Sequence, residues 1–257
     1  MHLQITTKNI IGEARRSRTI DSWRRLGLEP TYVWTQNRAT AFQYFSPELN
    51  SYIRGATGCI NSHRAAWARF LESNNTYCLI TEDDSIPEHN LVFEIEQIES
   101  FGIHFSELQT DSSIPKPLIV QLGWFVFPKT SIWRVVSAII HLVLIRGPIR
   151  HGYTRGFTFG THCYLINREM AEFMSKALSS SILPLDVQLK NLSEYYIGSG
   201  INFLRPIQCF AHQERLDSLI MNQLDRSGFR NNLTRNLATL VQSIGDAKTE
   251  RFNIKDS

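Results

Sequence analysis

Residues 77–87 read YCLITEDDSIP, so three consecutive carboxylates directly follow a short apolar run. The run 77–81 has the length and the aromatic and apolar composition of a core strand, and Pro87 is expected to mark the exit into a turn. The chain is therefore predicted to carry three acids at the carboxyl end of a buried strand. These acids are Glu82, Asp83 and Asp84.

This position favours a binding site, because open α/β sheets bind ligands in the crevice outside the carboxyl ends of their strands. Adjacent carboxylates repel one another unless a positive charge neutralises them, and hard cations such as Mg²⁺ and Mn²⁺ prefer carboxylate oxygen. A metal site and a solvated acidic turn are both compatible with the segment taken alone. The rest of the chain has to decide between them.

Composition indicates a globular protein with a mild positive charge. The chain has 257 residues, of which 42% are hydrophobic, enough to bury a core as one large domain or as one domain with an appendage. The formal net charge is +3 and the pI about 8.7, which suits contact with phosphates or an anionic membrane surface. There is no basic tract of the kind that nucleic-acid binders carry, so we expect no nucleic-acid partner.

Cysteine usage and the N-terminus favour a cytoplasmic location. The four cysteines are widely spaced in apolar surroundings and form no CxxC pair, as expected for reduced, buried thiols. The N-terminal residues MHLQITTKN lack a basic region followed by an apolar core, so they predict a first strand and no signal peptide.

The segment 132–145, IWRVVSAIIHLVLI, leaves two interpretations open. It is apolar but interrupted by Arg134 and His141, and basic residues flank it. It is too short for a transmembrane helix, which needs about 20 apolar residues. It is either a buried helix or an interfacial helix that makes peripheral contact with the inner face of a membrane.

Strand-like and helical patterns alternate along the chain. Strands are predicted at 3–7, 32–35, 77–81, 118–122 and 157–166, and helices at 12–27, 58–72 and 168–178, the last capped by Asn167. Residues 103–117 are expected to form a loop. This order predicts an α/β fold with a mainly parallel sheet and helices on both faces, in a single domain over 1–225. An amphipathic helix and a polar tail are expected over 226–257.

The segment GCINSHRAAWARFLES (58–73), read together with YCLITEDDSIP, resembles glycosyltransferase family 25, the lipooligosaccharide-biosynthesis and procollagen galactosyltransferase family. The family pattern runs GCxxSHxxxW and then an apolar strand that ends in EDD. Downstream, GTHCYLINREMAEFM (160–174), LPLDVQL (183–189) and FLRPIQCFAHQERLDSLI (203–220) are similar to later family segments. The N-terminal ITTKNIIGEARRS departs from the family pattern, so the basic residue that faces the donor is left open there.

The resemblance implies a GT-A-like fold and inverting, metal-assisted transfer of a hexose, most often galactose, from a UDP-sugar. The implied cofactor is Mn²⁺ or Mg²⁺, and the implied acceptor is a saccharide or a lipid-linked glycan, as in lipopolysaccharide biosynthesis. As in DXD motifs, Asp84 is expected to bind the metal. Glu82 and Asp83 are then expected to bind the donor, through the ribose or the metal's water shell.

Two residues further along the chain are candidates for the chemistry. An inverting displacement needs a general base that takes the acceptor proton, and Asp186 is the candidate. It follows Pro184 at a predicted helix start, so an ordinary capping aspartate is the alternative. His212 is a candidate metal ligand, with a core or surface histidine as the alternative.

Four further residues are candidates for donor binding. Ser62 and His63 fall on the helix before the acidic strand, on a side that could face the nucleotide. Arg15 and Arg16 follow the first strand and could meet phosphates or the uracil edge. A structural histidine and a solvated arginine face are the alternatives.

Two other function classes compete with an active transferase. One is a catalytically inactive relative that binds sugar nucleotides or glycans as a scaffold. The other is a metal-dependent nucleotidyl or phosphoryl transferase, although the chain has no GxxxxGK phosphate loop.

Overall fold

The structure is a computed structural model, and it describes most of the N-terminal four fifths of the chain. The described residues are 1–35, 51–107, 116–124, 153–178, 183–196, 199–206 and 209–213. The predicted interfacial or buried segment 132–145 and the predicted tail 226–257 lie outside these residues.

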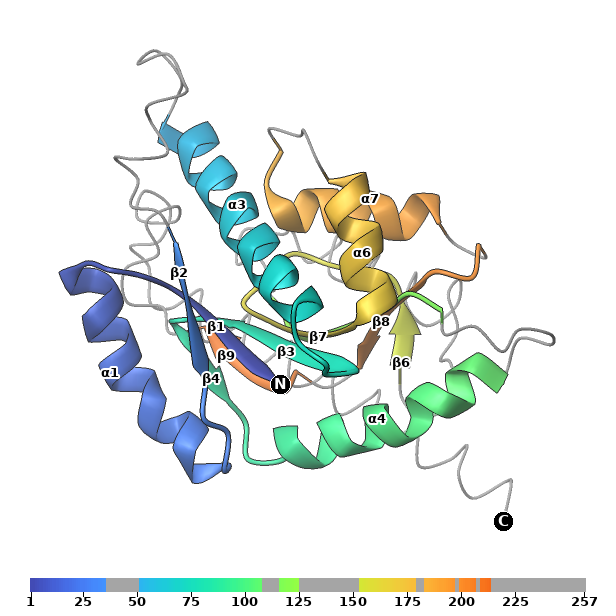
Figure 1. Cartoon of the computed structure of the whole chain (residues 1–257), viewed down its shortest axis with the longest axis horizontal. Helices are drawn as coiled ribbons and strands as arrows, with labels where there is room; N and C mark the ends of the chain where they lie inside the picture. The colour runs from blue at the N-terminus through green and yellow to red at the C-terminus, as the bar shows by residue number, and fades with distance from the viewer. Residues whose placement is uncertain are drawn as a thin grey trace, which may run out of the picture.

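Helices and strands alternate along the chain (Figure 1). The strands are β1 His2–Thr7, β2 Thr31–Thr35, β3 Tyr77–Glu82, β4 Ser85–Pro87, β5 Leu118–Gly123, β6 Tyr153–Arg155, β7 Cys163–Asn167, β8 Asn202–Pro206 and β9 Ala211–Gln213. The helices are α1 Ile10–Arg25, α3 Ser51–Leu71, α4 Leu91–Glu107, α6 Arg168–Ala177 and α7 Leu185–Tyr195.

The main sheet has the strand order β2-β1-β3-β7-β5-β8-β6. β1 pairs in parallel with β2 and β3, and β5 pairs in parallel with β8. β7 runs antiparallel to β3 and β5, and β6 runs antiparallel to β8. Five of the seven strands therefore point the same way, which confirms the predicted mainly parallel sheet. A second, two-stranded sheet pairs β4 with β9.

Each face of the main sheet buries its own apolar cluster because side chains alternate along the strands. On β3, Cys78 and Ile80 pack on the side of α3, α6 and α7, with Trp67 among their neighbours. Leu79 points the other way, into the cluster that holds Trp23 of α1 and Ile98 of α4. Figure 1 shows α3, α6 and α7 above the sheet and α4 below it. The prediction of helices on both faces is confirmed.

The start of α6 is fixed by a side chain that the sequence singled out. The side-chain oxygen of Asn167 accepts a hydrogen bond from the backbone N–H of Met170 at 3.0 Å, which is an N-cap. The same oxygen accepts from the backbone N–H of Leu118 at 2.9 Å. Asn167 therefore caps the helix and ties its start to the neighbouring strand β5.

Two of three local predictions differ from the structure. The strand predicted at 157–166 begins only at Cys163, because the preceding residues form a loop in which Gly160 has φ +106°. α4 extends to Glu107, so the first part of the loop expected at 103–117 is helical. Pro87 is the last residue of the short strand β4 and precedes a turn at residues 89–90, as predicted.

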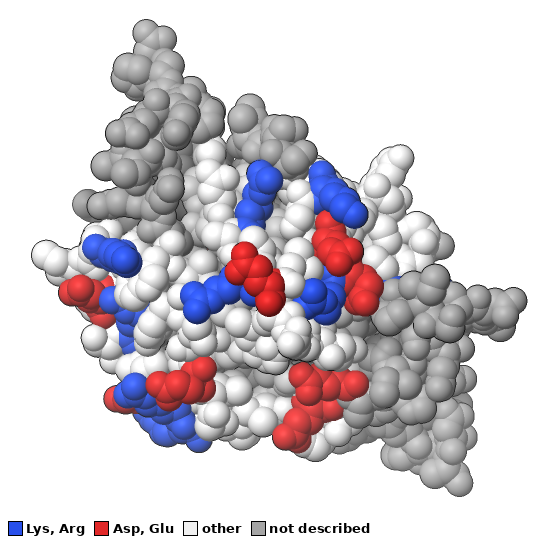
Figure 2. Space-filling view, viewed as in Figure 1, with Lys and Arg blue, Asp and Glu red and all other residues white. Residues whose placement is uncertain are grey.

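Charge is mixed on the visible surface. On the face shown in Figure 2, lysines and arginines are interspersed with aspartates and glutamates. None of the helices in the described ranges combines the length and the apolarity needed to cross a bilayer. All four cysteines carry free thiols, as predicted.

Glu94 of α4 gives the fold a testable pH dependence. Its carboxylate accepts a hydrogen bond from the hydroxyl of Tyr153 in β6, and burial raises the pKa of Glu94 from 4.5 to about 7. A carboxyl whose pKa is raised by folding stabilises the protein below its unfolded pKa, and that contribution is lost as the pH rises through the folded value. Wild type should therefore lose stability between pH 4.5 and about 7.

In Glu94→Gln, the loss of unfolding free energy between low and high pH is expected to be smaller than in wild type by about 1–3 kcal/mol. This is less than the free energy that corresponds to the whole pKa shift, because the side chain is part-exposed and solvent screens its charge. Urea unfolding at pH 5 and pH 8 measures the difference. Glu96→Gln changes an exposed acid on the same helix and is the matched control. An unchanged pH dependence in Glu94→Gln would show that Glu94 is not the group responsible.

Candidate active site

The three acids lie at the carboxyl edge of the main sheet, as the sequence predicted. β1 and β3 are parallel neighbours in which Ile5 pairs with Glu82, so both strands end at this edge. Asp83 and Asp84 form the turn that leads into β4. The antiparallel strand β7 begins here, which brings the loop that precedes it to the same place.

Asp83 is buried and ties α1 to the ends of β1 and β3. Its Oδ2 accepts a hydrogen bond from Thr6 Oγ1 at 2.7 Å, and its Oδ1 lies 3.5 Å from Arg15 Nη1. Thr19 Oγ1 donates to the backbone oxygen of Asp83 at 3.0 Å. Burial raises the pKa of Asp83, although Thr6 and Arg15 oppose the shift. These contacts anchor the helix, and donor binding by Asp83 stays a prediction.

Asp84 is 3% exposed, and one of its carboxylate oxygens has no hydrogen-bond partner among the described residues. Its Oδ2 accepts a hydrogen bond from Gln213 Nε2 at 2.8 Å and lies 3.7 Å from Arg15 Nη1. Its Oδ1 is buried and has no hydrogen-bond partner among the described residues. Burial first, and the charge of Glu82 second, raise the pKa of Asp84 to about 7. A cation at this oxygen would supply the missing interaction.

Glu82 points toward α3 and the loop before β7. Its Oε1 accepts a hydrogen bond from Thr161 Oγ1 at 2.9 Å and lies 3.6 Å from Nε2 of His63. Burial acts to raise the pKa of Glu82, but His63, His162 and Thr161 together outweigh it and lower the pKa overall. Glu82 is therefore an ionised group at the edge of the site.

His63 is held by a buried network. Its Nδ1 lies 2.7 Å from the hydroxyl of Tyr164, which also accepts a hydrogen bond from Trp67 Nε1 at 3.0 Å. His63 and Trp67 are four residues apart on α3, so they share one face of the helix. The structure thus brings His63 to Glu82. Ser62 donates to the backbone oxygen of Gly58 at 2.6 Å, within its own helix.

Removing the tyrosine hydroxyl should destabilise the protein. In Tyr164→Phe, Trp67 Nε1–H and His63 Nδ1 both lose their partner in a dry core. Leaving buried polar atoms unsatisfied costs about 1–3 kcal/mol, and we expect a loss of unfolding free energy in that range. Urea unfolding measures it, with Tyr195→Phe at a position 80% exposed as the control. Equal stabilities of the two variants would contradict the network.

Asp186 lies in the first turn of α7, where Pro184 occupies the N-cap without a side-chain cap. Its Oδ1 accepts from the backbone N–H of Val187 at 2.9 Å and its Oδ2 from that of Gly160 at 3.4 Å. Burial raises the pKa of Asp186, and the charge of Glu82 adds to the shift. Gly160 is followed by Thr161, which donates to Glu82, so Asp186 and Glu82 contact the same loop.

Gln121 of β5 supports the loop that carries Gly160 and Thr161. Its Nε2 donates to the backbone oxygen of Gly160 at 2.7 Å, and its Oε1 accepts from the backbone N–H of Thr158 at 2.8 Å. Sequence analysis missed Gln121 because nothing local distinguishes it from other strand residues. It also missed the contact residues Thr6, Thr19, Thr161 and Gln213.

The two arginines of α1 take different positions. Arg15 Nη1 lies within 3.7 Å of carboxylate oxygens of both Asp83 and Asp84, and its side chain is 13% exposed. Arg15 is therefore not part of a solvated helix face. Arg16 Nη1 instead donates to Thr6 Oγ1 at 2.7 Å and to the backbone oxygen of Thr7 at 3.0 Å.

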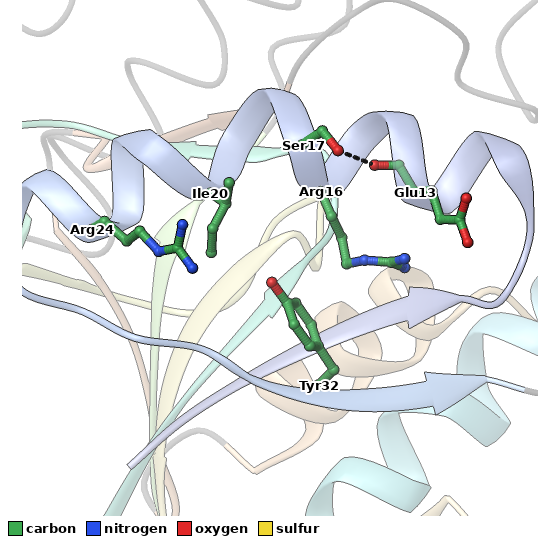
Figure 3. Close-up of a pocket in the computed structure, with 6 residues that line it drawn as sticks. All are labelled: Glu13, Arg16, Ser17, Ile20, Arg24 and Tyr32. Atoms are coloured by element: carbon green, nitrogen blue, oxygen red, sulfur yellow. Dashed lines mark hydrogen bonds between the residues drawn. The ribbon is translucent and has the colours of Figure 1, made fainter.

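Arg16 also lines an open cavity of about 360 Å³ between α1 and β2 (Figure 3). Its guanidinium lies 5.4 Å from the ring centroid of Tyr32 and 4.7 Å from that of Trp34. The other lining residues are Glu13, Ser17, Ile20 and Arg24. Glu82, Asp83 and Asp84 do not line this cavity, so the cavity and the acid cluster are separate features.

The structure does not bring His212 to Asp84. His212 Nε2 lies 2.6 Å from Glu88 Oε1, and the side chain is 57% exposed. Side chains alternate along β9, and the next residue, Gln213, is the one that reaches Asp84. The described contacts thus place Gln213, and not His212, against Asp84, and metal binding by His212 stays a prediction.

Comparisons with known proteins bear on the family of the chain. No curated protein matches the chain. Among solved structures, that of mouse xyloside xylosyltransferase 1 in its apo form matches at 16% identity with a TM-score of 0.33, covering 78% of this chain and 77% of that chain. The family model described as "Glycosyltransferase family 25 (LPS biosynthesis protein)" matches residues 37–189, more than half of the chain. The chain belongs to glycosyltransferase family 25.

Proposed function

We propose that this protein transfers a hexose from a UDP-sugar to a saccharide or glycoconjugate acceptor, with inversion and with help from a divalent metal. UDP-galactose is the first candidate donor because the family resemblance implies it. Family membership supports glycosyl transfer as the reaction class. The observation that carries the proposal is the acid cluster at the carboxyl edge of the sheet, where Asp84 keeps a buried oxygen without a described partner.

The residues at this edge fit a hard cation. Carboxylate oxygens are the ligands that Mg²⁺ and Mn²⁺ prefer, and such ions are commonly held by one or two carboxylates together with substrate phosphates. Asp84 would hold the metal, and Glu82 would bind the ribose or the metal's water shell. When bound, the metal would stabilise the negative charge that develops on the leaving diphosphate.

Arg15 and Arg16 supply positive charge and stacking surface for the donor. Arg15 lies between the two aspartates, so its guanidinium can pair with a phosphate that approaches the metal. Arg16 lies over Tyr32 and Trp34, which suits the edge of a uracil ring. Ser62 turns to its own helix, so we propose that it shapes the donor site through α3, while His63 orients Glu82.

Asp186 is proposed as the general base. An ionised carboxylate near Glu82 can accept the proton of the acceptor hydroxyl as that oxygen attacks the sugar. A raised pKa makes this carboxylate a stronger base than an ordinary aspartate.

The location is proposed as cytoplasmic, with residues 132–145 as a peripheral membrane contact through which a lipid-linked acceptor is reached.

A donor screen tests the proposal. The purified protein is incubated with Mn²⁺ and a panel of nucleotide sugars, and nucleotide release is followed. UDP release from a UDP-hexose is the expected result. Binding of a UDP-sugar without turnover under any acceptor supports the scaffold hypothesis, and the absence of both binding and turnover overturns the proposed donor class.

A further inference from the structure

A cysteine, a histidine and a glutamate converge beside the acid cluster. Cys59 and His63 are four residues apart on α3, and Glu82 ends β3. The sulfur of Cys59, a ring nitrogen of His63 and a carboxylate oxygen of Glu82 all lie within 4.8 Å of one another. Sulfur, imidazole nitrogen and carboxylate oxygen are the ligand types of zinc sites, whereas Mg²⁺ and Mn²⁺ prefer oxygen alone.

The imidazole of His63 is aimed at this cluster. The residue is 1% exposed, and its Nε2 has no hydrogen-bond partner within the described part of the chain. That nitrogen lies 3.6 Å from Glu82 Oε1. Two ligand atoms about 2.1 Å from a tetrahedral ion are roughly 3.4 Å apart, so this pair is close to the spacing that zinc requires.

The other ring nitrogen of His63 is already fixed. Nδ1 lies 2.7 Å from the Tyr164 hydroxyl. With the proton on Nδ1, the histidine donates to the tyrosine oxygen and leaves the Nε2 lone pair for a metal, as metal-binding histidines usually do. With the proton on Nε2, the tyrosine donates instead and the histidine faces Glu82 as a donor. Metal binding selects the first tautomer.

The charges around Cys59 favour a cation. The sulfur of Cys59 lies within 4.8 Å of a carboxylate oxygen of Glu82, so a negative charge stands beside the thiol. A divalent cation would replace the thiol proton, which leaves to solvent as the sulfur–metal bond forms. It would also offset the repulsion between the surrounding carboxylates.

We propose that Cys59, His63 and Glu82 form a binding site for a thiophilic divalent cation of the Zn²⁺ type, distinct from the hard-metal site at Asp84. Glu82 is also proposed to bind the donor, so an ion bound to Cys59, His63 and Glu82 would withdraw Glu82 from donor binding. Zinc would thus inhibit the enzyme by competing with donor binding. This last consequence rests on the proposed function, whereas the metal site itself does not.

Co²⁺ is the probe for binding, because a cobalt–thiolate bond gives a charge-transfer band in the near ultraviolet. Wild type is titrated with Co²⁺ alone, beside Cys59→Ser and the control Cys209→Ser, which alters the other part-exposed cysteine. The band should appear in wild type and in Cys209→Ser, and it should be absent in Cys59→Ser. His63→Gln should weaken Co²⁺ binding at least about tenfold, with circular dichroism as the check on folding.

A band that persists in Cys59→Ser, or no band in wild type at millimolar Co²⁺, overturns the site. The regulatory consequence is tested separately by calorimetric titration of UDP with Mn²⁺, with and without Zn²⁺. Weaker UDP binding in Zn²⁺, relieved in Cys59→Ser, is the expected result. A cobalt band without any effect of Zn²⁺ on UDP leaves the metal site standing and removes Glu82 from the donor site.

Discussion

Asp84→Asn is expected to abolish Mn²⁺-dependent UDP binding, with a loss in affinity of at least about 100-fold, since even supporting residues of metal sites often contribute 10–100-fold. Asparagine keeps the shape of the side chain and can still accept the 2.8 Å hydrogen bond from Gln213. It removes the negative charge that a hard cation needs. The fold should stay intact or become more stable, because a buried carboxylate is costly and a neutral amide is less so.

Calorimetric titration of UDP in the presence of Mn²⁺ measures the effect, and urea unfolding checks the fold. Glu88→Gln is the matched control: Glu88 pairs with His212, and its described contacts lie apart from Asp84. It should bind UDP as wild type does. Wild-type affinity in Asp84→Asn would move the donor-linked metal away from Asp84, and the cluster of Cys59, His63 and Glu82 would become the next candidate.

The elements that could be predicted from the sequence are those whose formation depends on residues close together in the chain. β3 was predicted because its apolar run is continuous and ends in charge, and it forms at Tyr77–Glu82. α6 was predicted because Asn167 is a good N-cap before an amphipathic pattern, and the cap forms as expected. Such signals lie within a short stretch of sequence, so they can be recognised without knowledge of the tertiary structure.

The parts that the sequence did not predict depend on distant partners. Thr6 contacts Asp83 across 77 positions, and Gln213 contacts Asp84 across 129. His212 and Gln213 differ by one position, and only the register of β9 against β4 decides which of them faces the acids. A single sequence carries no signal of that register. The acids themselves could be found because they are adjacent in sequence and follow a strand.

Asp186 is not the N-cap residue of α7. A capping aspartate sits at the N-cap and accepts from backbone N–H groups two or three residues on, but Pro184 is the N-cap here. Asp186 instead accepts from its immediate neighbour Val187 and from Gly160, in the loop before β7. That loop also presents Thr161 to Glu82. The carboxylate is therefore linked to the same edge of the sheet as the acids of β3.

Asp186→Asn is accordingly expected to keep UDP binding within about threefold while lowering turnover at least about 100-fold, the usual scale for losing a general base. Asparagine has a single acceptor oxygen, so it can keep the 2.9 Å contact with the backbone N–H of Val187 but not also the 3.4 Å contact with that of Gly160, and its neutral amide cannot take up a proton. The acidic limb of the wild-type pH–rate profile should have its midpoint at a higher pH than the pKa of an ordinary aspartate, because burial raises the pKa of Asp186. This limb should vanish in the variant.

Steady-state rates with donor and acceptor measure both effects. Glu194→Gln, at the far end of the same helix, removes the charge of a 2.8 Å ion pair with Lys190 and should turn over normally. Near-normal turnover in Asp186→Asn would assign the proton to another group and leave Asp186 as a positioning residue for the loop.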